Sequence, residues 1–199
     1  MSLAARGFLP VFFCCLLAAC SGDKATRPPT VPPPAPVEDP SQVVWDAQPG
    51  GLNLHLLTKH DLNEMDGTPL GLSLCVYQLA DVKRFNALAG TAVGLDTLQE
   101  CTVEAADAVA AKRFWLQPGE YQEIVMDRAE RAKNLAVVAG YAHLKPELSA
   151  AVAPFLLHSE KEGYIPFFRT TVYSAASRME YIINLSVSAV SVKGIERGQ

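Results

Sequence analysis

Alternating apolar and polar positions recur after about residue 50 and predict β-strands. Residues 52–56 and 70–77 alternate with period two, which is typical of strands with one buried face. The run 135–141 is apolar throughout and predicts a strand buried on both faces. Further strands are predicted at 112–117, 121–126, 164–173 and 181–192. The sum is about seven strands, which favours an antiparallel β-sandwich.

A helical insertion is predicted after the second strand. Asp81 suits the cap of a short helix that ends near residue 89 and places Phe85 and Leu88 on one face. The alanine-rich stretch 95–111, interrupted at residues 101–103, predicts one or two more helices. The fold class is therefore mainly β with a short helical insertion.

Between these elements lie turns, loops and one ambiguous stretch. Residues 117–120 read Gln-Pro-Gly-Glu and suit a type II turn. The charged stretch 127–133 predicts a solvated loop, and 149–162 fits neither period. The polar stretch 58–69 is longer than an ordinary hairpin loop, and loops of that length are usually functional or disordered.

The first twenty residues have the pattern of a cleavable signal peptide. Arg6 precedes an apolar run over 7–19, which is about thirteen residues and shorter than the roughly twenty that span a bilayer. The run ends in Leu-Ala-Ala before Cys20 and resembles a bacterial lipobox. We expect cleavage after residue 19 and a firm anchor of several acyl chains on Cys20. The alternative is an ordinary signal peptide with an incidental cysteine.

Residues 20–41 predict a tether rather than a folded segment. Seven prolines fall between residues 28 and 40, and large apolar side chains are almost absent. Proline-rich chain extends by about 3.1 Å per residue, so some twenty residues reach on the order of 60 Å. A ligand for a proline-binding domain is the alternative. The remainder, 42–199, has the length of one periplasmic domain.

Charge and cysteine content narrow the function classes. Without the signal peptide the chain has 16 basic and 21 acidic residues, and its charges form no basic stripe. We therefore do not expect it to bind nucleic acid. An oxidising compartment permits a disulfide between Cys75 and Cys101. The spacing of the two cysteines does not decide between this disulfide and two separate cysteines that pack as small buried side chains.

Neither catalytic nor metal-binding residues are predicted. The four histidines are scattered and have no zinc-ligand spacing. The acidic stretch 61–67 fails the calcium-loop pattern, because its fifth position is Met65 and its twelfth is Leu72. The stretch 71–75 lacks the second glycine of a nucleophile elbow. We expect no cofactor beyond the covalent lipid, and no enzyme.

A series of short motifs resembles one bacterial family. Leu62-Asn63 and then Gly-Thr-Pro-Leu at 67–70 occur in the long loop, Val-Tyr-Gln-Leu ends the next strand at 76–79, and Pro-Gly-Glu at 118–120 precedes Ala-Val-Val-Ala-Gly-Tyr at 136–141. In this order, behind a lipobox and a proline tether, they resemble TssJ (SciN, VasD), the outer-membrane lipoprotein of type VI secretion. The chain departs from the family's frequent Trp-Arg pair after this strand.

The resemblance implies a transthyretin-like two-sheet antiparallel β-sandwich, an outer-membrane location facing the periplasm, and no catalysis. It also implies binding to the periplasmic C-terminal part of a TssM-like inner-membrane protein through the loop between the first two strands. On this chain the expected contact residues are Leu62, Asn63, Glu64, Met65 and Asp66, with Leu62 and Met65 as exposed apolar anchors. For Leu62 the alternative is a side chain that folds back into the core.

A carrier for a small apolar or glycan ligand is the competing hypothesis. It predicts a closed apolar cavity of several hundred cubic ångströms between the sheets. A core packed at ordinary density would exclude it.

Overall fold

The computed structural model describes residues 34–163 and 169–195. The predicted signal peptide, the lipidation site Cys20, most of the predicted tether and residues 164–168 of the predicted strand 164–173 lie outside them. Contacts divide the chain into units 1–33 and 34–199, and all the described residues belong to the second unit. Among these residues, no helix combines the length and the apolar character needed to cross a bilayer.

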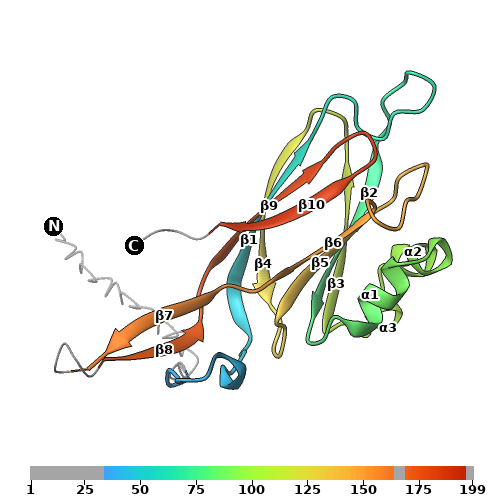
Figure 1. Ribbon diagram of the computed structural model, residues 1–199. Coiled ribbons are helices and arrows are strands. Elements are labelled where there is room, and N and C mark those ends of the chain that lie inside the picture. The colour runs from blue at the N-terminus through green and yellow to red at the C-terminus, as the bar shows by residue number, and fades with distance from the viewer. Residues whose placement is uncertain (1–33, 164–168, 196–199) are drawn as a thin grey trace, which may run out of the picture. The chain divides into compact units, whose positions relative to one another are not determined.

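Eight strands form two four-stranded sheets (Figure 1). The first sheet has the order β10-β9-β1-β4, and the second has the order β3-β2-β5-β6. The first comprises β1 (Gln48–Thr58), β4 (Tyr121–Arg128), β9 (Met179–Leu185) and β10 (Val190–Ile195). The second comprises β2 (Leu72–Leu79), β3 (Ala110–Leu116), β5 (Asn134–Ala139) and β6 (Ala150–Pro154). The predicted two-sheet sandwich is confirmed, with one parallel pair, β1–β9, among antiparallel ladders.

The core lies between the two sheets. Leu52, Leu54 and Leu56 of β1 are fully buried there, as the period-two pattern predicts. Leu74 and Val76 of β2 face them from the second sheet. Burying a leucine side chain contributes about 1.5–3 kcal/mol, so these alternating positions fix which face of each strand points inward.

The predicted helical insertion follows β2 and covers the outer face of the second sheet (Figure 1). It comprises α1 (Lys83–Ala89), α2 (Ala92–Gln99) and α3 (Val103–Ala106). Phe85 of α1 and Leu98 of α2 are buried against Tyr77 of β2. The predicted cap Asp81 lies one residue before the N-cap, which is Val82 and makes no side-chain cap bond; its carboxylate still accepts a hydrogen bond from the backbone N–H of Lys83 at 2.7 Å. The prediction of helix up to residue 111 was wrong, since the left-handed residue Asp107 (φ 53°) ends α3 and the chain then enters β3.

A two-stranded ribbon, β7 (Leu157–Glu162) with β8 (Thr170–Ala175), stands beside the two sheets (Figure 1). The ambiguous stretch 149–162 thus forms β6 and β7. Val37 pairs with Tyr173 of β8 in an isolated bridge, and η1 (Pro40–Gln42) follows. The last residues of the predicted tether therefore contact the domain.

The final predicted strand, 181–192, is two strands in the structure. The N–H of Ser186 donates to the carbonyl of Ala189 at 2.9 Å, and this turn separates β9 from β10. Val187 is consequently exposed rather than buried on one face with Ile183 and Leu185. The period-two pattern continues through the turn by coincidence, which is why it does not reveal the break.

The charged stretch 127–133 is not wholly a solvated loop, because Arg128 is buried at the end of β4. Its guanidinium donates to the carbonyls of Asp46 and Ala176 and lies 5.5 Å from the centroid of the Trp45 ring. Burial lowers the pKa of Arg128 from its usual value. This arginine ties the segment before β1 to the segment before β9, a role that composition does not indicate.

Candidate functional site

The loop 59–71 connects β1 to β2 at one end of the sandwich (Figure 1). Its first residue is fixed on both sides, because the N–H of Lys59 donates to Leu185 and its carbonyl accepts from Gly119. Its last part is closed by a hydrogen bond from the N–H of Leu70 to the carbonyl of Leu62. The turns β3–β4 and β9–β10 lie at the same end, so the loop is anchored to both sheets.

Leu62 is fully buried in the core between the sheets. The prediction that it is an exposed anchor for a partner was wrong, and the alternative of a core plug is correct. The physical reason is that the open end of a sandwich must be closed by apolar side chains from its loops. The sequence could not decide this, because a single leucine beside an asparagine in a polar loop has no repeating pattern that separates a buried side chain from an exposed one.

Asn63 is also buried and holds the loop in shape. Its side-chain nitrogen donates to the carbonyl of Gly71 at 3.2 Å, and its side-chain oxygen accepts from the N–H of Ala142 at 2.8 Å. Its backbone has φ 48°, a left-handed conformation that asparagine tolerates better than most residues. Asn63 is therefore a structural residue at the loop root rather than an exposed contact.

The exposed tip of the loop is a small hairpin turn over residues 65–68. Met65 and Thr68 exchange both backbone hydrogen bonds, at 3.0 and 2.9 Å. Asp66 and Gly67 between them have φ 52° and 76°, and positive φ at both central positions is the hallmark of a type I′ turn. The Asp-Gly pair is the sequence signal for this turn. Glu64, Met65 and Asp66, three of the five predicted contact residues, are exposed here, and Met65 is 40% exposed.

The tip presents an apolar side chain among carboxylates. Asp61, Glu64 and Asp66 are all exposed. In the described part of the chain, no three His, Cys, Asp or Glu side chains converge as metal ligands would. An exposed methionine with an acidic surround fits a partner surface that has an apolar hollow and a basic rim.

The β3–β4 turn supports the loop from beside its root. Gly119 has φ 70°, which strains a residue with a side chain, and a Cβ on it would lie 2.5 Å from Nδ1 of His60, so a substitution would also displace this histidine. The carboxylate of Glu120 accepts from the side chain of Gln122 and from the N–H of Gln117, both at 2.7 Å. These hydrogen bonds lower the pKa of Glu120. The turn is thus a rigid neighbour of the loop.

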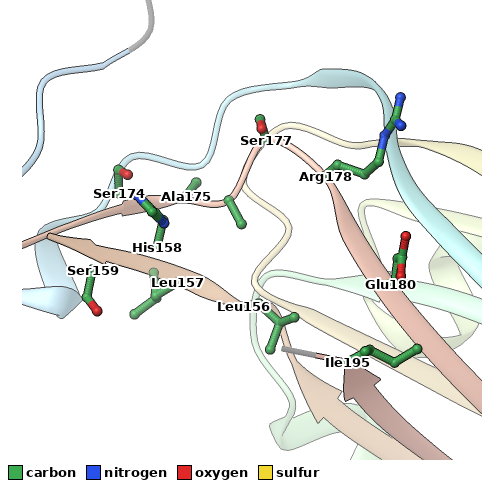
Figure 2. Close-up of a pocket in the computed structure, with 11 residues that line it drawn as sticks. Leu156, Leu157, His158, Ser159, Ser174, Ala175, Ser177, Arg178, Glu180 and Ile195 are labelled. Carbon is green, nitrogen blue, oxygen red and sulfur yellow. The ribbon is translucent and has the colours of Figure 1, made fainter. Parts of the chain in front are cut away.

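Two surface cavities lie away from this loop. The larger, of about 690 Å³, opens where the β7–β8 ribbon meets the end of β10. Figure 2 shows His158 of the ribbon and Arg178 at different ends of its wall rather than converging on one point. The smaller, of about 400 Å³, lies between α1 and β6. Neither is the closed cavity between the sheets that the carrier hypothesis predicts.

A disulfide joins Cys75 to Cys101, with their Cα atoms 5.6 Å apart. The sequence alone did not decide whether these two cysteines pair. Cys75 lies on the outer face of β2, and Cys101 lies between α2 and α3. The bridge therefore fastens the helical layer to the second sheet.

Comparison with known proteins gives a consistent result. Residues 51–165 match the family described as type VI secretion lipoprotein, VasD, EvfM, TssJ. A comparison with curated protein sequences found no match.

Solved structures of such lipoproteins share the fold. The lipoprotein TssJ1 from Pseudomonas aeruginosa is 18% identical with a TM-score of 0.55, over 77% of this chain and 99% of its own. The membrane-bound type VI component Lip from Serratia marcescens is 15% identical with a TM-score of 0.52, over 78% and 100%. A chain of a type VI membrane complex is 21% identical with a TM-score of 0.51, over 76% and 99%.

Proposed function

This chain belongs to the type VI secretion lipoprotein family of VasD, EvfM and TssJ, and from that premise we propose that it anchors the secretion membrane complex to the outer membrane. In this proposal a lipid on Cys20 holds the chain in the inner leaflet. The exposed tip of the loop 59–71 binds the periplasmic C-terminal domain of a TssM-like inner-membrane protein.

The family consists of structural lipoproteins that are not enzymes, which confirms the prediction of no catalysis. The role to be explained is therefore binding and attachment. The proposed division of the chain is a signal peptide over 1–19, a lipidated tether from Cys20 and a periplasmic domain that extends to residue 199.

The observation that carries the proposal is an exposed tip on a rigid root. Leu62 and Asn63 are buried and fix the root, while Glu64, Met65 and Asp66 project into solvent on a two-residue turn. A preformed loop loses little conformational entropy on binding, so its exposed side chains contribute more of their interaction energy to affinity. Met65 supplies the apolar anchor, and Glu64 and Asp66 set orientation by pairing with basic groups of the partner.

The test is calorimetry of the full-length lipoprotein in detergent with the periplasmic domain of the TssM-like protein encoded with it. We expect saturable one-to-one binding, weakened at least tenfold by Met65→Asp. Val125→Asp is the control, because Val125 is an exposed apolar residue on β4 of the first sheet, outside the loop 59–71. Equal affinities for the wild-type protein and Met65→Asp would refute the loop assignment, and absence of binding by the wild-type protein would refute the adaptor role.

Attachment is tested separately by Cys20→Ala. We expect this variant to leave the membrane fraction and appear among soluble periplasmic proteins, because no acyl chains can be added. Unchanged sedimentation with outer membranes would show that another feature attaches the protein.

A further inference from the structure

Trp115 is the most exposed aromatic side chain among the described residues, at 67%. It lies near the end of β3, the edge strand of the second sheet, directly opposite Ser73 of β2. The N–H of Gly140, just after β5, donates to the carbonyl of Ser73 at 2.8 Å. Trp115, Ser73 and Gly140 therefore form one row across the outer face of the sheet, with a large ring beside two small residues.

The helical layer ends at this row and leaves the ring itself exposed. A Cβ on Gly140 would lie 3.1 Å from Oε1 of Gln99, the last residue of α2, so α2 reaches the Gly140 end of the row but not Trp115. Tyr77 and Cys75 occupy the next rows on the same face, and both are covered, since the hydroxyl of Tyr77 donates to Leu98 of α2 and Cys75 is bonded to Cys101. Arg113, two residues before Trp115, donates to the carbonyls of Gln99 and Glu100 at the end of α2. In Figure 1 the helices lie against the part of this sheet that is remote from the loop 59–71.

On its other side the row adjoins the root of that loop. Gly71, the last loop residue, is only two residues before Ser73, and a Cβ on it would lie 3.0 Å from Oε1 of Gln117, two residues after Trp115. Asn63 of the loop binds the N–H of Ala142, two residues after Gly140. Two strand residues span about 7 Å, so the Trp115 row lies close to the root of the loop whose tip carries Met65.

We propose that Trp115 is a second anchor for the same TssM-like periplasmic domain, packing against it while the Met65 tip is engaged. This inference rests on the proposed function. Tryptophan is one of the residues enriched at interface positions that dominate affinity, and exposure of most of an indole ring to water is unfavourable in a free protein. The exposed end of the row gives the partner an apolar ring beside the small side chain of Ser73, on the part of the sheet that leads to the loop 59–71.

The test is site-specific photo-crosslinking of the full chain in cells, with p-benzoylphenylalanine in place of Trp115, Met65 or Val125. We expect a crosslink to the TssM-like protein from positions 115 and 65, and none from 125, which is 63% exposed on the outer face of the first sheet. In calorimetry, Trp115→Ala is expected to weaken binding at least tenfold, and Trp115→Phe by less. A ring at the surface is not needed for folding, so both variants are expected to keep the wild-type unfolding midpoint.

The possible outcomes distinguish failure of the Trp115 anchor from failure of the proposed function on which it rests. Crosslinking from position 65 but not 115, with wild-type affinity in Trp115→Ala, would overturn the second anchor and leave the loop assignment intact. A crosslink from 115 to another copy of this chain or to lipid alone would also overturn it. Failure at both 65 and 115 would overturn the loop assignment and the second anchor together, and only absence of wild-type binding in calorimetry would overturn the adaptor role.

Discussion

The side-chain oxygen of Asn63 accepts a hydrogen bond from the backbone N–H of Ala142, 79 residues later in the chain, at 2.8 Å. This contact joins the loop between β1 and β2 to the connection between β5 and β6. The same side chain donates to Gly71, across the neck of its own loop. One asparagine thus determines the position of the exposed tip relative to the second sheet.

Replacing this asparagine should affect both stability and binding. Asn63→Ala removes two hydrogen bonds and places alanine at φ 48°, and an unsatisfied buried group costs about 1–3 kcal/mol. We expect a loss of about that size in the free energy of unfolding, measured by urea denaturation, together with weaker partner binding. Asn63→Gly keeps the backbone conformation and isolates the hydrogen bonds. An unchanged urea midpoint in both variants would contradict the structural role.

Leu62 and Met65 are apolar residues of the same loop, and their replacement is expected to affect different properties: stability for Leu62 and partner affinity for Met65. Leu62→Ala should lower the free energy of unfolding by about 2–5 kcal/mol, because it leaves a cavity at a fully buried position. Met65→Ala should change it by less than about 0.5 kcal/mol and act on partner affinity instead. Urea denaturation and calorimetry of the two variants distinguish these effects. A destabilised Met65→Ala would mean that the tip also contributes to the core.

The Cys75–Cys101 disulfide should stabilise the helical layer. It closes a loop with a sequence separation of 26 residues, for which the chain-entropy relation predicts about 3.5 kcal/mol. We expect the free energy of unfolding of the double variant Cys75→Ala, Cys101→Ala to be lower by about that amount, with unfolding at a lower urea concentration. Adding a reductant should lower the wild-type midpoint but not that of the double variant. Insensitivity of the wild-type protein to a reductant under native and denaturing conditions would show that the thiols are free.

Stability should fall under alkaline conditions. Burial raises the pKa of Tyr77 to about 12, and it also raises the pKa values of Tyr141 and Tyr181. In the unfolded chain these hydroxyls titrate near pH 10, so between pH 10 and 12 the unfolded state loses protons that the folded state keeps. The free energy of unfolding is therefore expected to fall as pH rises above 10. Denaturation of Tyr77→Phe over the same range should show a shallower decline; an equal slope would assign the effect to other groups.

The strands of the core were predictable from the sequence because their burial follows period two. Leu52, Leu54 and Leu56 need only the local pattern, and the helical insertion is marked by a cap and a change of period. The break between β9 and β10 was missed, since Val187 and Ala189 continue the alternation through the turn. Pairing partners, including the parallel β1–β9 ladder, depend on contacts between distant segments and leave no local trace.

The candidate site was predictable in position but not in detail. Loop length and the Asp-Gly pair indicate an exposed turn at residues 66–67, and the structure has one there. The burial of Leu62 and Asn63 depends on the space left at the end of the sandwich and on an amide 79 residues away. Trp115 was not singled out, because an aromatic residue in a strand is usually buried, and its exposure follows from where the helical layer ends.

The Val37–Tyr173 bridge lies at the end of β1 opposite the Met65 tip. If the chain is held by lipid at one terminus and by a partner at that tip, tension during secretion runs along β1 rather than across it. The hydrogen bonds of β1 with β4 and β9 then resist together in shear, while the single Val37 bridge opens first by peeling. A few residues of chain released in this way would lengthen the tether under load and leave the sandwich folded.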